Sequence, residues 1–242
     1  MESLFRFATS ISSNENFARD VYIKSTLTIE LDQMLKQISC TGNCVECSSS
    51  MRILTETPAI NLLCDIFEAI LLHGLKEKFV SRVSSVFASR SPDRSGHFCA
   101  DFWAVIVALC HNEELEYLKR LTTIHSNVGR CRAWLRSALN ESLLRSYFET
   151  LICDSSIVNS FYRASAYIRD KQHTDLLRQF IIDLEKYNFE LSVDNVDLNC
   201  WSNSTLKYLG IAIDHSQDTL VITALDAIHL LSENHASQYL VC

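Results

Sequence analysis

The spacing of apolar residues predicts helices over most of the first 190 residues of the chain. The first helix is expected from about Ala18 to Ser39, after a cap region at Asn14 to Phe17, because apolar residues recur there near the 3.6-residue period. These apolar positions are Val21, Leu27, Leu31, Leu35 and Ile38.

A second helix is predicted over INLLCDIFEAILLHGLK, residues 60–76, with Thr57 as N-cap and Pro58 in the first turn. One broad face of this helix holds Ile60, Leu63, Cys64, Phe67, Ile70, Leu71 and Leu75. The back is apolar as well, since Leu62, Ile66 and Ala69 stand beside His73. The helix is therefore either central and buried or keeps a second apolar face for a partner.

Further helices alternate with polar segments along the chain. Residues 77–97 are expected to form a Ser- and Arg-rich loop, and Ser126-Asn127 should cap a helix over VGRCRAWLRSALNE, residues 128–141. A buried helix is predicted at Cys99–His111, and another begins at Asn112, with Glu113 and Glu114 in its first turn. Three more helices are predicted at Leu143–Cys153, Ser156–Ala164 and Thr174–Tyr187.

These patterns predict an all-α fold, a single compact multi-helix domain. No segment alternates apolar and polar residues as a strand does, and the chain has only 5 Gly and 2 Pro for turns. After Asn188 the helical pattern weakens, although TLVITALDAIHLL at 219–231 is expected to form one more helix. We therefore predict an N-terminal segment at 1–17, a helical domain at 18–189 and a partly ordered C-terminal extension at 190–242.

Charge is distributed unevenly along the chain. The net charge of −7 argues against nucleic-acid binding, which needs clustered Lys and Arg. Between residues 119 and 145, however, six basic residues stand against the single acid Glu141. They are Lys119, Arg120, Arg130, Arg132, Arg136 and Arg145. We expect this cationic segment to attract an acidic partner.

The termini and the apolar runs predict a cytoplasmic protein. The N-terminal residues include Glu2 and Arg6 and lack the apolar core of a secretion signal. The longest apolar run, residues 102–110, is about half of the roughly 20 residues that a membrane span requires. We therefore expect the ten cysteines to be reduced thiols.

Cys40, Cys44 and Cys47 have the C-x3-C-x2-C spacing seen in the cluster loop of radical enzymes that use S-adenosylmethionine. Such a loop follows a barrel strand and has glycine-rich cofactor contacts, whereas here a helix precedes it and glycines are scarce. A zinc site would need a fourth ligand, and Cys64 belongs to the core face of its own helix. We expect loop cysteines, with no metal or cofactor; a thiolate metal or cluster enzyme is the alternative.

Cys131 is the other thiol close in sequence to a histidine, His125. It falls on the apolar face of its helix, and the sequence supplies neither a third orienting group nor a glycine-rich oxyanion hole. We therefore expect no enzymatic activity.

Five blocks of the chain, in the same order, resemble the RUN domain family. The most characteristic block is NVGRCRAWLRSALNESLLRSYFETLI at 127–152. The others are LCDIFEAILLHGLK at 63–76, DFWAVIVAL at 101–109, FYRASAYIRD at 161–170 and LLRQFIIDLEKYNFELS at 176–192. Within the family, GRCRAWLR, the FELS turn and LNCW around Trp201 look most like the RUN module of the pleckstrin-homology-domain-containing family M, which are endolysosomal adaptors.

The resemblance implies a helical interaction module without catalytic residues. Many RUN domains are effectors of small GTPases, so it implies an adaptor that binds a Rab- or Arf-like small GTPase in its GTP form. It also implies a place in endosomal and lysosomal trafficking and autophagy, with membrane recruitment through the GTPase and with motor or tethering proteins as further partners. A motor or cytoskeletal adaptor that does not depend on the nucleotide is the alternative.

The period of the helix at 128–141 separates its three arginines. Arg130 falls on the outward side, whereas Arg132 falls in the apolar sector and Arg136 on its margin. Because a buried arginine needs a counter-charge, we expect Arg132 to pair with a carboxylate, Asp65 or Glu68.

The candidate partner-binding residues are His73, Lys76, Arg130, Arg132 and Arg136. The resemblance implies that the histidine and the motif arginines contribute to the GTPase contact. We predict that His73 and Arg130 border an apolar patch that receives the GTPase switch region. The expected structural anchors are Phe67, Trp103, Trp134 and Leu135.

Overall fold

Helices dominate the part of the chain that the computed structural model describes, namely residues 2–40, 52–76, 101–200, 203–209, 213–214 and 221–222. The α-helices are α1 (Glu2–Cys40), α2 (Pro58–Leu72), α3 (Trp103–Leu109), α4 (Asn112–Lys119), α5 (Asn127–Asn140), α6 (Leu144–Cys153), α7 (Ser155–Phe161), α8 (Lys171–Leu184) and α9 (Asn203–Tyr208). The short 3-10 helices are η2 (Tyr167–Arg169) and η3 (Val196–Asn199), and the strands are β1 (Arg52–Thr55), β2 (Tyr187–Glu190), β3 (Ile213–Asp214) and β4 (Val221–Ile222). The predicted all-α fold is confirmed.

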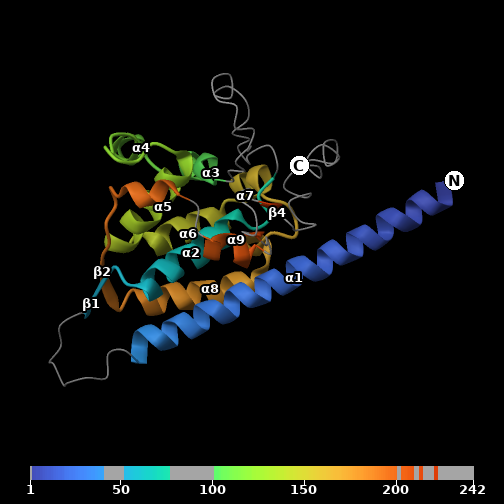
Figure 1. Cartoon of the computed structure of the whole chain (residues 1–242), viewed down its shortest axis with the longest axis horizontal. Helices are drawn as coiled ribbons and strands as arrows, with labels where there is room; N and C mark the ends of the chain where they lie inside the picture. Colours follow the sequence, from blue (N-terminus) through green and yellow to red (C-terminus); the bar gives the residue numbers. More distant parts are fainter. Residues whose placement is uncertain are drawn as a thin grey trace.

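Helix α5 lies in the middle of the body, between α2, α3, α4, α6 and η3 (Figure 1). The hydroxyl of Ser126 accepts a hydrogen bond from the backbone N–H of Gly129, so the predicted cap is confirmed. Every residue from Val128 to Leu139 is buried except Arg130. The helix is thus enclosed on nearly all sides, because neighbours cover the face that its sequence period marks as outward. The predicted anchors Trp134 and Leu135 are buried, as is Phe67 of α2, whereas Trp103 is half-buried.

Helix α2 is also central, which decides between the two interpretations of its apolar back. Ile66 and Ala69 are fully buried, since α1 and α9 pack on this helix. Thr57 caps the helix as predicted, but the helix ends at Leu72 rather than continuing to residue 76. The end comes at Gly74, whose φ of +75° is strained for other residues. A Cβ at Gly74 would meet Ala166 Cβ at 2.4 Å, so the turn is also too tight for a side chain.

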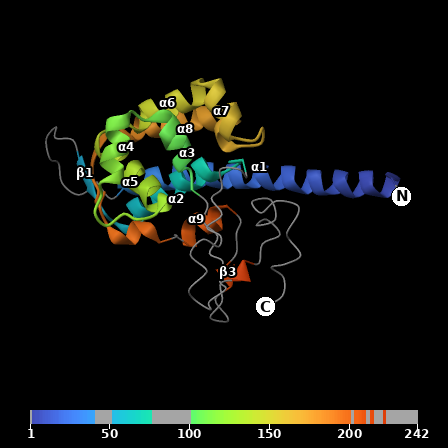
Figure 2. The same cartoon turned by 90° about the horizontal axis from the view of Figure 1, so that it is seen from above.

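Helix α1 is much longer than predicted, and the expected cap at Asn14 to Phe17 is wrong. No Gly or Pro occurs between Glu2 and Cys40, so nothing interrupts the helical backbone. Its C-terminal half packs on α2 and α8, while its N-terminal half runs past the body (Figures 1 and 2). The buried positions are Ile23, Leu27, Leu31, Met34 and Ile38. Of the other two periodic positions, Val21 is exposed, and Leu35 is half-buried and packs against the core.

Two short strands, which the sequence pattern did not indicate, join distant parts of the chain. β1 and β2 pair in parallel, with Leu54 opposite Phe189. These two side chains are buried, whereas Ile53 and Asn188 are exposed. On the chain just after β2, the side-chain amide of Asn140 donates to the carbonyl of Leu191 and accepts from its N–H. Strand β2 also explains why α8 ends at Leu184 instead of reaching residue 187.

The first part of the predicted C-terminal extension packs on the helical body. Leu198 in η3 and Leu209 after α9 are buried, η3 contacts α5, and α9 contacts α2. The predicted helix at 219–231 lies outside the described residues apart from Val221–Ile222, which pair antiparallel with Ile213–Asp214. For these two residues the helix prediction is wrong.

The other predicted helices are confirmed with shorter bounds. α4, α6 and α7 lie where the sequence placed them. α3 covers only part of the predicted Cys99–His111, and its Val107 is exposed, so the helix is buried on one side only. The predicted loop at 77–97 lies outside the described residues. Within the described ranges, no helix has the length and apolar character to cross a membrane.

Leu27→Ala is expected to destabilise the protein by about 2–5 kcal/mol, because Leu27 is fully buried between α1 and the body. Ile29→Ala, at a position 55% exposed on the same helix, is the matched control and should change stability by less than about 1 kcal/mol. Urea unfolding followed by circular dichroism measures both. Equal effects of the two substitutions would contradict the docking of α1 described here.

Candidate partner-binding surface

Arg132 is held inside the body by a buried carboxylate. Its Nε lies 2.9 Å from Glu68 Oε1, and its Nη2 lies 2.9 Å from Glu68 Oε2. Thr205 Oγ1 donates to the same Oε2 at 2.8 Å, and Arg132 Nη1 donates to the backbone carbonyl of Cys200. Burial lowers the pKa of Arg132, but the Glu68 carboxylate has the opposite effect. The pKa is raised overall, and the guanidinium therefore stays charged. The predicted pairing of Arg132 is confirmed with Glu68, and this side chain is not available to a partner.

Arg136 is buried as well, and its side chain contacts residues at the start of α2. Its Nη2 donates to Asn61 Oδ1 at 3.2 Å, and its Nε lies 3.7 Å from Glu56 Oε1. Only 7% of the residue is exposed. Of its two predicted roles, structural or partner-binding, the structure shows the structural one.

His73 does not lie on a surface, because α1 covers the end of α2. The residue is 4% exposed, its Nδ1 accepts a hydrogen bond from the backbone N–H of Tyr167, and its Nε2 lies 3.4 Å from Asp20 Oδ1. The prediction that His73 borders an apolar patch open to a partner is therefore wrong. The histidine instead links α2, α1 and η2.

The contact with His73 lowers the pKa of the Asp20 carboxyl. Burial would raise its pKa, but hydrogen bonds to His73 and Ser165 and the nearby charges of His73 and Arg163 lower it overall. Asp20 is therefore ionised at neutral pH and holds α1 to the body. A second ion pair, between Lys24 Nζ and Asp170 Oδ2 at 2.6 Å, joins α1 to the segment before α8.

Lys76 lies at the opposite edge of the body from the start of α2, beyond the Gly74 turn. Its Nζ donates to the carbonyl of Asn159 at 2.6 Å and its backbone N–H to the carbonyl of Phe161. The half-exposed Lys76 therefore secures α7 against the end of α2.

Arg130 is the one predicted arginine of α5 that reaches solvent. Its Nη1 donates to Asn127 Oδ1 at 3.0 Å, and the residue is half-buried. Around this first turn of α5 lie the end of α4, the loop 121–126 and η3. We use the name α5 entry surface for five residues of this region, four of them exposed and Arg130 half-buried. They are Tyr117, Arg120, His125, Arg130 and Val196.

The α5 entry surface is held in a fixed shape by two side chains from the segment after β2. Asp194 accepts hydrogen bonds from the backbone and hydroxyl groups of Thr122 and Thr123 at 2.7–2.9 Å. These bonds hold the pKa of Asp194 well below its usual range. Asn199 Oδ1 accepts from the backbone N–H groups of His125 and Ser126. Their partners are more than 70 residues away in sequence, so no local pattern could have identified these two residues.

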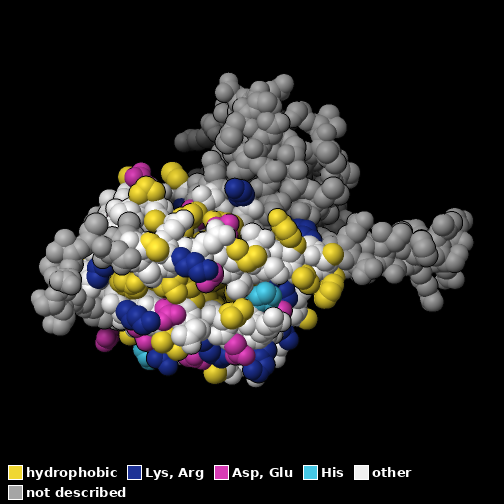
Figure 3. All heavy atoms as spheres, turned by 90° about the horizontal axis from the view of Figure 1, so that it is seen from below, with side chains coloured by type: hydrophobic (Ala, Val, Ile, Leu, Met, Phe, Trp, Pro, Cys, Tyr) yellow, Lys and Arg dark blue, Asp and Glu magenta, His cyan; other side chains and the backbone are white. Residues whose placement is uncertain are grey.

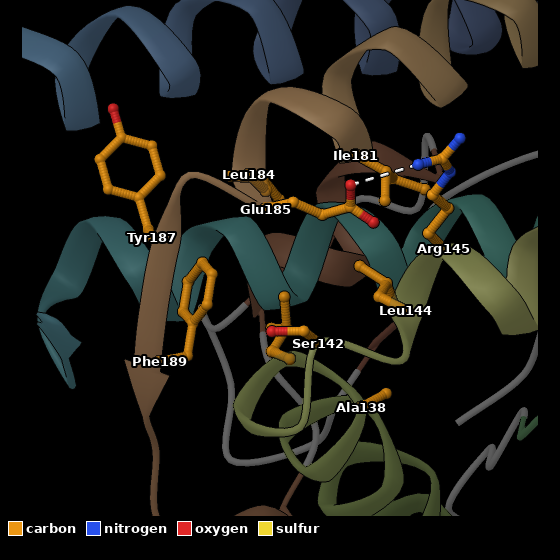
Figure 4. A pocket seen from close by; sticks show the side chains of 10 residues that line it. Ala138, Ser142, Leu144, Arg145, Ile181, Leu184, Glu185, Tyr187 and Phe189 are labelled. Carbon is orange, nitrogen blue, oxygen red and sulfur yellow. Dashed lines mark hydrogen bonds and ion pairs between the residues drawn. The ribbon is translucent and has the colours of Figure 1, made fainter. Parts of the chain in front are cut away.

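A cleft lies between the end of α5, α6, α8 and β2 (Figure 4). Its wall is mainly apolar, from Ala138, Leu144, Ile181 and Phe189, and Arg145 and Glu185 form an ion pair at its edge. The volume of the cleft is about 20 Å³. That volume admits a water molecule or a methyl group but not a metabolite.

The cysteines within the described ranges are free thiols. Cys40 is exposed at the end of α1, while Cys44 and Cys47 lie outside the described residues. Burial raises the pKa of Cys64 to about 11 and that of Cys131 well above its usual value, so neither forms a thiolate at neutral pH. Among the described residues, no group of His, Cys, Asp and Glu is arranged to hold a metal ion.

Helices packed around internal ion pairs, with one fixed and partly cationic surface, define an all-α module. The family model of the RUN domain matches residues 62–195, more than half of the chain, and the chain belongs to the RUN domain family. It is similar to the Pleckstrin homology domain-containing family M member 2 of Mus musculus, with 26% identity over 146 residues. The Homo sapiens protein of the same name is 26% identical over 132 residues.

These matches cover 57% and 54% of the chain but only 12% and 11% of the two relatives. The chain thus spans a small part of the length of these proteins. The family resemblance predicted from the sequence blocks is confirmed.

Removing one partner of the buried ion pair is expected to be costly. Glu68→Gln should destabilise the protein by about 3–5 kcal/mol, because the Arg132 charge would remain buried without its counter-charge. The double variant Glu68→Met/Arg132→Met should be more stable than Glu68→Gln alone. Glu185→Gln, which breaks the exposed pair with Arg145, is the control and should cost less than about 1 kcal/mol. Urea unfolding tests all three, and a small effect of Glu68→Gln would contradict the described burial.

Because the pKa of Asp20 is lowered by its contact with His73, we expect this contact to contribute to stability in a pH-dependent way. Since its folded-state pKa lies below the ordinary value of 3.8, the contribution is present above that pH and is lost as the pH falls through the folded-state pKa. Asp20→Asn should therefore be less stable than the parent at neutral pH, and the difference should shrink at acid pH. Thermal unfolding between about pH 3 and 7 measures it, with the exposed Asp32→Asn as control. A difference that stays constant over this range would exclude ionised Asp20 as its cause.

Proposed function

We propose that this chain is a non-catalytic adaptor module that binds a Rab- or Arf-like small GTPase in its GTP form during endosomal and lysosomal membrane trafficking. Membership of the RUN domain family carries the proposal, because many modules of this family are GTPase effectors. The two similar proteins are named for a pleckstrin homology domain, which lends support to an adaptor with several domains. Recruitment to the membrane would be indirect, through the GTPase.

The α5 entry surface is our proposed GTPase-binding surface. It combines the exposed apolar side chains of Tyr117 and Val196 with the cationic Arg120 and Arg130. Such a combination suits a partner that offers an apolar centre with acidic neighbours, because burial gives affinity while charge steers the encounter. Its fixed loop supports this assignment, since a preformed surface loses little entropy on binding. Of the five residues first predicted from the sequence, only Arg130 belongs to this surface.

Arg130→Glu is expected to weaken binding of the GTP-loaded GTPase by about tenfold or more, because it reverses a charge in the interface. A glutamate in the first turn of a helix complements the helix dipole, so the substitution should leave the fold intact. The measurement is the Kd of purified Rab- and Arf-like proteins, each loaded with GTP analogue or GDP. Arg145→Glu, a similar change at the exposed edge of the cleft, is the matched control and should bind as the parent does.

Two outcomes would oppose the proposal in different ways. Unchanged binding by folded Arg130→Glu would remove the α5 entry surface from the interface. Equal affinity for the GTP and GDP forms would instead favour an adaptor that does not depend on the nucleotide.

A further inference from the structure

Thr122 lies in the loop between α4 and α5, close to the basic end of α4. The sequence KRLT places Lys119 and Arg120 three and two residues before this threonine. Thr122 is exposed, and no helix or strand includes residues 121–126. Kinases select their substrates largely by charge pattern, and basic residues shortly before an exposed hydroxyl form one such pattern. Thr122 therefore has the sequence context of a kinase substrate.

The basic side chains of this pattern are accessible. Arg120 is exposed and forms no ion pair with any residue of the described ranges, so its guanidinium is open to the acidic groups of a kinase. Lys119 pairs with Glu116 of its own helix at 3.0 Å, and such an exposed pair is weak. On the face that α1 and α8 form, basic side chains instead stand beside acidic ones (Figure 3), and ion pairs such as Lys36–Asp32 belong to these helices.

The hydroxyl of Thr122 is one of the donors that hold the Asp194 carboxylate. Thr122 Oγ1 donates to Asp194 Oδ2 at 2.7 Å, and the backbone N–H of the same residue donates to this oxygen at 2.9 Å. The N–H and the hydroxyl of Thr123 donate to Oδ1 at 2.8 Å and 2.7 Å. An ionised carboxylate can only accept hydrogen bonds, so a negative group in place of one donor would repel it.

We propose that Thr122 is a phosphorylation site for a kinase that recognises basic residues, and that its phosphate releases Asp194 from the loop. In this reaction the hydroxyl oxygen of Thr122 forms a bond to the γ-phosphorus of ATP, while the bond from that phosphorus to the bridging β,γ-oxygen breaks. ADP leaves, and the hydroxyl proton passes to a carboxylate of the kinase. The product has lost the hydroxyl donor and carries about −1.5 to −2 charges at pH 7 beside the carboxylate of Asp194.

Release of Asp194 changes the α5 entry surface in two ways. The loop before α5 loses one of its two anchors, so the surface is no longer preformed. The phosphate also offsets the positive charges of Arg120 and Arg130, which favour an acidic partner. Phosphorylation therefore acts against GTPase binding. This consequence rests on the proposed function, whereas the modification and the release of Asp194 do not.

Treatment of the full chain with the catalytic subunit of cyclic-AMP-dependent protein kinase, ATP and Mg²⁺ tests the site. Mass spectrometry of the peptides should find phosphate on Thr122. Arg120→Gln should lower the initial rate at Thr122 by about tenfold or more, because it removes a charge-assisted contact with the kinase. Arg145→Gln, at an exposed position beside the cleft, is the matched control and should keep the parental rate. Absence of phosphate on Thr122, phosphate on Thr123 instead, or equal rates in the two folded variants would overturn the site.

Amide hydrogen exchange tests the release of Asp194. Because the N–H of Thr123 donates to this carboxylate, phosphorylation of Thr122 should speed its exchange by about tenfold or more. Asp194→Ala should give the same increase without phosphate. The N–H of Ser156, which donates to the carboxylate of Asp154 at 2.8 Å, is the matched control and should exchange as in the parent. Unchanged exchange at Thr123 in the phosphorylated chain would overturn the release.

The affinity of the phosphorylated chain for the GTPase separates this inference from the proposed function. The Kd for the GTP-loaded Rab- or Arf-like protein that the parent binds should rise by about tenfold or more on phosphorylation. Kinase treatment of Thr122→Val should leave the Kd of that variant unchanged, which excludes an effect of phosphate at other positions. If the parent binds no GTPase, the proposed function fails, while the phosphate on Thr122 and the exchange at Thr123 still test this inference. Parental affinity in the phosphorylated chain would overturn the effect on binding.

Discussion

The pairing of Glu68 with Arg132 is the interaction on which the arrangement of the body depends. A carboxylate and a guanidinium can be buried only when their remaining hydrogen-bonding groups are satisfied. Thr205 donates to the carboxylate, and the carbonyl of Cys200 accepts from the guanidinium. The pair therefore fixes α2 against α5 and requires the segment after residue 195, where the family match ends, to cover both.

The same segment connects the interior to the α5 entry surface. Between β2 and α9 the chain supplies Asp194 and Asn199 to the loop before α5 and Leu198 to the core. A change in this segment would alter both the cover of the ion pair and the position of the loop. The shape of the proposed GTPase-binding surface thus follows from the need to satisfy a buried charge.

The sequence predicts the parts of this fold that depend on local chemistry. The Ser126 cap, the Thr57 cap and the pairing of Arg132 with a carboxylate follow from short patterns and from the cost of burying charge. Strands β1 and β2 were missed because four residues each are too few to show alternation, and each is stabilised by a partner more than 130 residues away. His73 was misplaced for a similar reason, since the period of α2 cannot reveal that α1 covers it.

Helix α1 shows where a single periodic pattern is insufficient. The period of Leu27 and Leu31 correctly marks the docked face, but the helix was expected to begin where that face ends. The helix instead continues back to Glu2, because no Gly or Pro between Glu2 and Cys40 ends it, and the period of the docked face carries no information on where the backbone stops being helical.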